Sequence, residues 1–99
     1  MAQDGTKTGN GNGEDLAVTA DRWNLFEVWG TFDGGNVSLE AKVDESTPVY
    51  MPLRDESGAI RTLSGAGSFE FRTSANLVRP VLAGGGGSED IVYRVRRVQ

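Results

Sequence analysis

Apolar and polar side chains alternate through most of the chain from Asp15 onwards, which is the spacing of a β-strand with one buried face. Residues 36–43 show this most clearly, because every second side chain is apolar and those between are polar. The apolar set is Val37, Leu39, Ala41 and Val43. A helix would scatter these four side chains around its surface, so the pattern predicts a strand.

Turn-forming residues divide the pattern into short segments, and none has the period of a helix. The predicted strands are residues 15–20, 23–32, 36–43, 48–53, 59–63, 67–73, 76–83 and 90–98. They favour an all-β chain: a single small antiparallel β-sandwich or jelly-roll-like barrel of about 7–8 short strands, joined mainly by sequential hairpins.

Residues 33–36, Asp-Gly-Gly-Asn, separate two alternating runs, and glycine there permits the positive φ of a tight turn. The pattern predicts a β-hairpin between residues 23–32 and 36–43. Large apolar groups occupy both faces of the first run, which predicts a central strand covered by the opposing sheet and by a loop or a neighbouring subunit.

Three prolines predict edge strands or bends, because proline cannot donate to a ladder: Pro48, Pro52 and Pro80. Near the end of the chain, the alternation changes phase at Arg97 and Val98. A β-bulge near Arg96 would explain that change.

Residues 1–14 are mostly Gly, Asn, Thr and charged groups, with almost nothing to bury. Ordering them would cost backbone entropy with little return, so we expect a flexible N-terminal arm followed by a sandwich domain over residues 15–99. No apolar run reaches the length of a membrane helix, and the N-terminus lacks the apolar stretch of a signal peptide. We expect a soluble protein without a membrane partner.

The chain of 99 residues has no His and no Cys, and its formal net charge is −4. The absence of both residue types excludes Ser-His-Asp and Cys-His catalysis and zinc–thiolate sites. The negative charge disfavours nucleic acid as a partner. We therefore expect no enzyme activity, no metal and no cofactor. Stability without disulfides suggests assembly in the cytosol, completed by contacts to other chains.

Paired carboxylates remain the one route to hydrolysis. The three acidic doublets fall at predicted strand ends, where such residues are normally solvated loop tips: Asp44-Glu45, Asp55-Glu56 and Glu89-Asp90. The glycine-rich residues 83–90 precede a strand rather than a helix, so they predict a flexible hairpin loop and no phosphate cradle. Residues 10–17 match a calcium-binding nonapeptide turn poorly, and a disordered tail is the preferred interpretation.

Six residues are interface candidates: Trp23, Trp29, Tyr50, Arg94, Arg96 and Arg97. The arginines, with Arg72 and Arg79 on nearby strands, predict a basic strip that meets an acidic protein surface or pairs with the chain's own Glu27, Glu40 and Glu70. The aromatic residues suit a sugar-stacking platform, core packing or an oligomer interface.

The run from Phe26 to Leu53, with the glycine-rich turn and the closing residues 90–99, resembles a group of small structural proteins of tailed bacteriophages. The matching positions are Phe26, Val28, Gly30, Thr31, Phe32, Gly34, Gly35, Val37 and Leu39. The resemblance departs at Tyr50, where such proteins often carry a Trp, and at residues 74–83.

The resemblance implies a virion part without an active site. The expected function is a capsid decoration (cement) protein that stabilises the phage head through a homo-oligomer, a trimer being favoured, and through the major capsid protein. Residues 1–14 would reach over neighbours. The alternative is a tail or fibre component that binds host glycans through Trp23, Trp29 or Tyr50. An unrelated carbohydrate-binding module and a small hydrolase are more distant alternatives.

Overall fold

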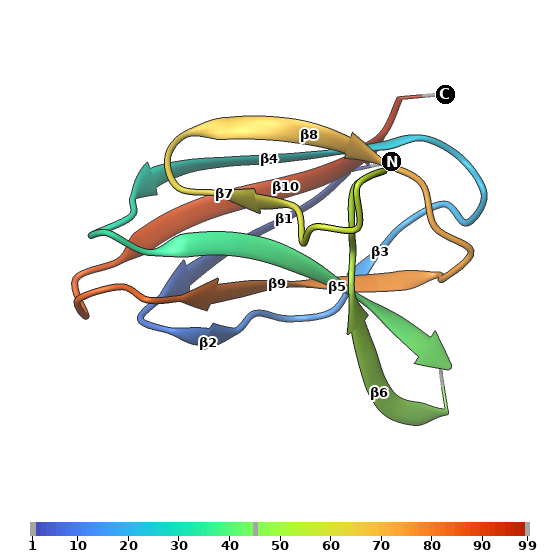
Figure 1. The fold of residues 1–99 in the computed structure, drawn as a ribbon, viewed down its shortest axis with the longest axis horizontal. Helices are drawn as coiled ribbons and strands as arrows, with labels where there is room; N and C mark the ends of the chain where they lie inside the picture. Colours follow the sequence, from blue (N-terminus) through green and yellow to red (C-terminus); the bar gives the residue numbers. More distant parts are fainter. Residues whose placement is uncertain (1, 45, 99) are drawn as a thin grey trace.

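Two antiparallel β-sheets face each other in the computed structural model, which describes residues 2–44 and 46–98 (Figure 1). Sheet A has the strand order β1-β10-β4-β8; sheet B has the order β2-β9-β5-β6, with β3 paired to β9 and β7 to β5. The strands are β1 (Ala2–Thr8), β2 (Gly11–Asn12), β3 (Leu16–Ala17), β4 (Asn24–Thr31), β5 (Asn36–Asp44), β6 (Thr47–Pro52), β7 (Thr62–Leu63), β8 (Gly67–Phe71), β9 (Leu77–Ala83) and β10 (Asp90–Arg97). The all-β sandwich is confirmed. Among the described residues there is no helix of the length and apolarity that crossing a membrane requires.

The core lies between the two sheets and is built from the inward-facing positions of the strands. On β4 and β10 every second residue is buried, as the alternation predicts. The buried apolar residues are Leu16, Phe26, Val28, Phe32, Val37, Leu39, Ala41, Phe69, Phe71, Val78, Leu82, Ile91, Tyr93 and Val95. The rings of Phe26 and Phe69 lie 5.4 Å apart on neighbouring strands. β4 is central in sheet A, between β10 and β8, as its two apolar faces predict.

The predicted hairpin between residues 23–32 and 36–43 is wrong, although its turn is right. Gly35 N–H donates to Phe32 O at 2.8 Å, and the two residues between them have positive φ, 48° at Asp33 and 78° at Gly34. This is the backbone of a type I′ turn. However, β4 belongs to sheet A and β5 to sheet B, so the turn carries the chain across the sandwich. Phe32 and Gly35, at the two ends of this turn, are both buried, so the connection between the sheets packs against the core.

The same crossing recurs at most other connections, so the expectation of mainly sequential hairpins is wrong as well. The chain changes sheet between β1 and β2, β3 and β4, β7 and β8, β8 and β9, and β9 and β10. The glycine-rich loop over residues 84–89 is one of these crossings and not a hairpin loop. The pairing of β5 with β6 is the hairpin that sequence order would suggest.

The N-terminal segment also differs from the expected flexible arm. β1 pairs along the whole edge of β10, from Ala2 opposite Arg96 to Thr8 opposite Asp90, and β2 pairs with β9. Backbone hydrogen bonds therefore hold a segment that has little apolar surface to bury. The division at residue 14 is not a domain boundary, because both sheets begin before it and Leu16 lies in the shared core.

The prediction that prolines mark edge strands or bends holds for two of the three. Pro48 and Pro52 lie on β6, which is an edge strand as expected. Pro80 lies on β9, between β2 and β5, so the prediction is wrong there. Its missing N–H faces the gap between β2 and β3, where Gly13 N–H donates to Pro80 O at 2.8 Å.

The predicted bulge near Arg96 is also absent, because the pairing of β10 with β4 keeps one register from Asp90 to Arg97. The alternation changes because the strand ends at Arg97. Val98 lies beyond the strand and donates its N–H to Trp23 O at 3.0 Å.

Candidate functional site

The six interface candidates lie in three separate places. Trp29, Arg94 and Arg96 share the outer face of sheet A, and Tyr50 lies on the outer face of sheet B. Trp23 and Arg97 lie at one end of the sandwich. Six residues along the strand direction separate Trp23 from Trp29, which is about 20 Å. The structure therefore contains no single aromatic platform among these residues.

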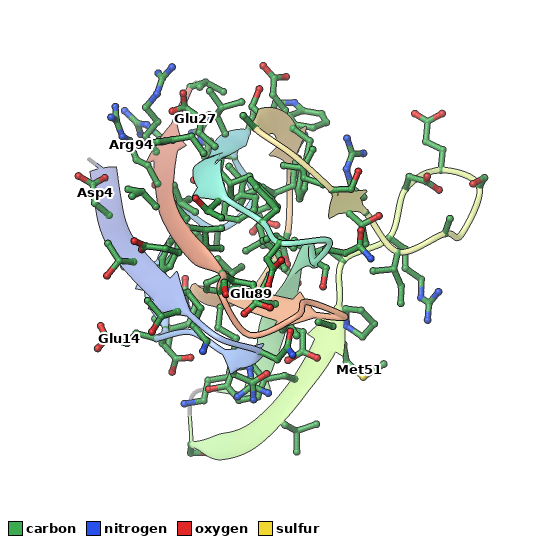
Figure 2. All side chains as sticks on the ribbon, turned by 90° about the vertical axis from the view of Figure 1, so that its left-hand side faces the viewer. Asp4, Glu14, Glu27, Met51, Glu89 and Arg94 are labelled. Atoms are coloured by element: carbon green, nitrogen blue, oxygen red, sulfur yellow. The ribbon has the colours of Figure 1, made fainter. Side chains whose placement is uncertain are left out.

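The outer face of sheet A carries a row of charged residues across three strands. Asp4, Arg94 and Glu27 stand opposite one another on β1, β10 and β4, and Figure 2 shows them in a row across these three strands. Arg94 Nε lies 3.4 Å from Asp4 Oδ1, and Arg96 Nε donates to Glu27 Oε1 at 3.2 Å. The guanidinium of Arg94 lies 5.6 Å from the ring centre of Trp29.

These carboxylates balance the arginines on which the predicted basic strip depends. Arg79, a further predicted member of the strip, lies on sheet B and pairs with Glu40 at 2.8 Å. Arg72 lies beyond the end of β8. The predicted alternative that the arginines pair with the chain's own glutamates is confirmed for Glu27 and Glu40, but none of the ion pairs between described side chains involves Glu70. The continuous strip is not formed by the described residues, because its members occupy different faces.

Tyr50 lies in a cluster of polar contacts on the outer face of sheet B. Its hydroxyl donates to Asp15 Oδ1 at 2.8 Å, and the guanidinium of Arg79 lies 3.5 Å from its ring centre. The hydrogen bond to Asp15, with a smaller contribution from burial, raises the pKa of Tyr50 above its ordinary value of 10.0. Lys42 completes the cluster with an ion pair to Asp15 at 3.7 Å. Tyr50 is thus held by its own chain.

Two exposed apolar side chains that sequence reasoning missed lie together on β6. The β5–β6 hairpin leaves the body of the sandwich (Figure 1), and Figure 2 shows Met51 pointing away from it. Val49 is 46% exposed and Met51 is 57% exposed. Both nevertheless lie on the inner face of sheet B, where Ala41, the residue opposite Met51, is buried. Alternation in the sequence indicates which face is apolar, but it cannot reveal that the opposing sheet ends short of the hairpin.

A hollow of about 220 Å³ lies beneath this hairpin. The side chains of Ala41 and Met51 border it on one side, and residues 73–75, which connect β8 to β9, border it on the other. We call Val49, Met51 and this hollow the hairpin surface.

A second region that sequence reasoning did not assemble surrounds Trp23. Segments from three parts of the chain meet there: residues 21–23, the loop of residues 53–61 and the end of β8. Arg97 lies nearby on a hollow of about 230 Å³ that it shares with Arg96 and residues 17–19. No local motif in the sequence predicts that these segments converge.

The acidic doublets behave differently from one another. Asp55 and Glu56 form an exposed loop tip, as expected. Asp55 Oδ1 accepts hydrogen bonds from Ser57 Oγ at 2.6 Å and Ala59 N at 3.1 Å, which hold the pKa of Asp55 below 3.8. Glu45 of the first doublet lies outside the described residues.

Glu89, in contrast, is buried, so the expectation of a solvated loop tip is wrong for it. Its exposed fraction is 2%, and Figure 2 shows it within the body of the molecule. Glu89 Oε1 accepts the Gly87 N–H at 2.7 Å. Asp33 accepts the Ser88 N–H at 2.9 Å, and Asn10 exchanges two hydrogen bonds with Gly85. The glycine-rich loop is therefore organised by three polar side chains.

Within the part of the chain that the structure describes, no three His, Cys, Asp or Glu side chains are placed to share a metal ion. The glycine and asparagine segment at residues 10–17 forms β2 and β3 instead of a calcium-binding turn or a disordered tail. No protein-family model matches the chain, and no curated protein or solved structure matches it significantly.

Proposed function

We propose that the protein is a structural subunit that assembles through the hairpin surface, and that its role is that of a capsid decoration protein on a tailed-phage head. The observation that carries this proposal is the exposure of Val49 and Met51 on a hairpin that leaves the sandwich. Large apolar side chains that gather at one exposed site mark protein contacts more often than isolated ones do. The resemblance of residues 26–53 to small phage structural proteins supports the same role.

The edge of β6 bears on how such a contact forms. Leu53 N–H donates to Leu39 O, and the two residues are opposite in the register of β5 and β6. The backbone nitrogens of the alternate residues, Pro52 and Tyr50, therefore face away from β5. Proline at 52 removes one of these outward donors, which blocks extension of the sheet by a further strand. The contact is expected to use the face of the hairpin and its hollow, not its edge.

Co-sedimentation with shells assembled from the cognate major capsid protein tests the role. The full chain should sediment with the shells, and Met51→Asp should abolish this, because a charge would be buried in an apolar contact. Ile60→Asp is the matched control: Ile60 is 42% exposed but lies outside the hairpin surface, so its binding should persist. Equal binding by the two variants, or no binding by the wild type, would contradict the proposal.

A truncation that removes residues 1–14 cannot show whether this segment binds the shell. That truncation would strip β1 from β10 and β2 from β9, and it would therefore disturb both sheets.

A further inference from the structure

Trp23 is an exposed aromatic side chain on a rigid backbone. It lies between β3 and β4 and is 40% exposed. Its carbonyl accepts the Val98 N–H at 3.0 Å, and the next residue, Asn24, is 1% exposed. Asn24 Nδ2 donates to Arg22 O at 3.0 Å and to Thr19 O at 3.1 Å. The indole is thus presented by a fixed segment, which lowers the entropy lost on binding.

Two hollows meet at this indole. The first, of about 190 Å³, lies between Trp23 and the loop of residues 53–61. The second, of about 110 Å³, lies between Trp23 and residues 21–22. Trp23 and Arg72 border both hollows, so a ligand that stacks on the indole has polar groups within reach on either side.

Eight charged residues line the two hollows, four of each sign: Asp21, Arg22, Arg54, Asp55, Glu56, Arg61, Glu70 and Arg72. None of them joins an ion pair with another described residue. The four ion pairs between side chains that the structure describes all lie on the outer faces of the sheets. Three of the eight are already engaged within the chain: Arg54 donates to Gly58 O, Arg61 lies 4.8 Å from the ring centre of Phe69, and Asp55 Oδ1 accepts hydrogen bonds from Ser57 and Ala59. Most of the donors and acceptors around Trp23 therefore remain open to a ligand.

We infer that this region, the Trp23 site, binds a neutral carbohydrate. A pyranose ring offers a face of C–H groups to the indole, and each hydroxyl both donates and accepts a hydrogen bond. Guanidinium groups donate in pairs and carboxylates accept, so the mixed lining suits paired hydroxyls. An anionic ligand would meet as many carboxylates as guanidinium groups, which disfavours it. This inference does not depend on assembly through the hairpin surface.

The test uses the full chain on an array of neutral and acidic oligosaccharides, with the binders then measured by titration calorimetry. Neutral oligosaccharides should bind. Trp23→Ala should weaken the affinity at least about tenfold. Trp29→Ala should leave it unchanged, because Trp29 is 39% exposed but lies on the outer face of sheet A. Added oligosaccharide should shift the indole N–H resonance of Trp23 and not that of Trp29.

Trp23→Tyr, which keeps an aromatic face, should retain most of the binding. Backbone amide spectra of each variant establish that it is folded. Three results would overturn the inference: no neutral oligosaccharide binds, only acidic oligosaccharides bind, or folded Trp23→Ala binds as tightly as the wild type.

Discussion

The backbone of Gly5 on β1 lies directly against the phenol ring of Tyr93 on β10. A Cβ atom at residue 5 would lie 2.5 Å from Tyr93 Oη and 2.6 Å from Cζ. The two residues are opposite in the register of an antiparallel pair, so their side chains would share one side of the sheet. An aromatic ring that covers a glycine on an edge strand is a known way to protect such a strand. Tyr93 thereby holds β1 in the sandwich.

Gly5→Val should therefore destabilise the protein by about 1–3 kcal/mol, because the new side chain competes with a buried ring. The control is Thr6→Val, which places the same side chain on the exposed side of the same strand. Thermal unfolding of the two variants checks this. Equal melting temperatures would mean that β1 is not packed on Tyr93 in solution.

The glycine-rich loop offers a second steric test. A Cβ atom at Gly85 would overlap the carboxylate of Glu89, whereas one at Gly65 meets nothing within 4 Å. Gly85→Ala should lower the free energy of unfolding by about 1–3 kcal/mol, and Gly65→Ala should not. In the background of Glu89→Ala, the further change Gly85→Ala should cost less. If the two costs simply add, Gly85 and Glu89 are not in contact.

The pKa of each tyrosine is raised above 10.0, and the causes differ. The hydrogen bond to Asp15 raises the pKa of Tyr50, and burial raises that of Tyr93. A raised pKa means that the contribution to stability is complete below pH 10 and is lost as the pH rises further. The ultraviolet absorbance of tyrosinate should therefore develop above pH 10. Asp15→Asn should lower the pKa of Tyr50 alone; an unchanged titration would contradict the Tyr50–Asp15 hydrogen bond.

The free edge of β6 gives a prediction about solubility. Pro52→Thr restores an outward N–H on an edge strand that also carries exposed Val49 and Met51. Strand addition should then become easier, so the variant should aggregate faster at equal protein concentration. Light scattering during incubation measures this. Unaltered scattering would show that proline 52 has no protective role.

The strands were largely predictable because the core depends on alternation. All eight predicted ranges overlap observed strands, and buried residues on β4, β5, β8, β9 and β10 follow period two. β1 and β2 were missed because backbone pairing, not apolar burial, holds them. The type I′ turn at Asp33-Gly34 was recognisable, but the same turn closes a hairpin or crosses a sandwich. Contacts distant in the sequence decide between these outcomes.

The candidate surfaces were less predictable than the strands. The sequence identified Trp23, Trp29 and Tyr50 as interface candidates but could not decide whether they form one platform. The hydrogen bond to Asp15 and the stacked Arg79 hold Tyr50 on the outer face of sheet B, away from the two Trp residues. The exposure of Val49 and Met51 follows from the relative lengths of two sheets. The charged lining around Trp23 comes from three distant segments. Neither feature has a local signature in the sequence.

The mass of the free protein in solution, measured by native mass spectrometry, tests assembly through the hairpin surface most directly. The wild type should be an oligomer, with a trimer favoured, and Met51→Asp should give a folded monomer, because Met51 is 57% exposed and is not needed in the core. Ile60→Asp should retain the wild-type mass. Two results would contradict the account. One is a wild-type chain that stays monomeric at concentrations well above those of the co-sedimentation experiment, and the other is an oligomer that survives Met51→Asp.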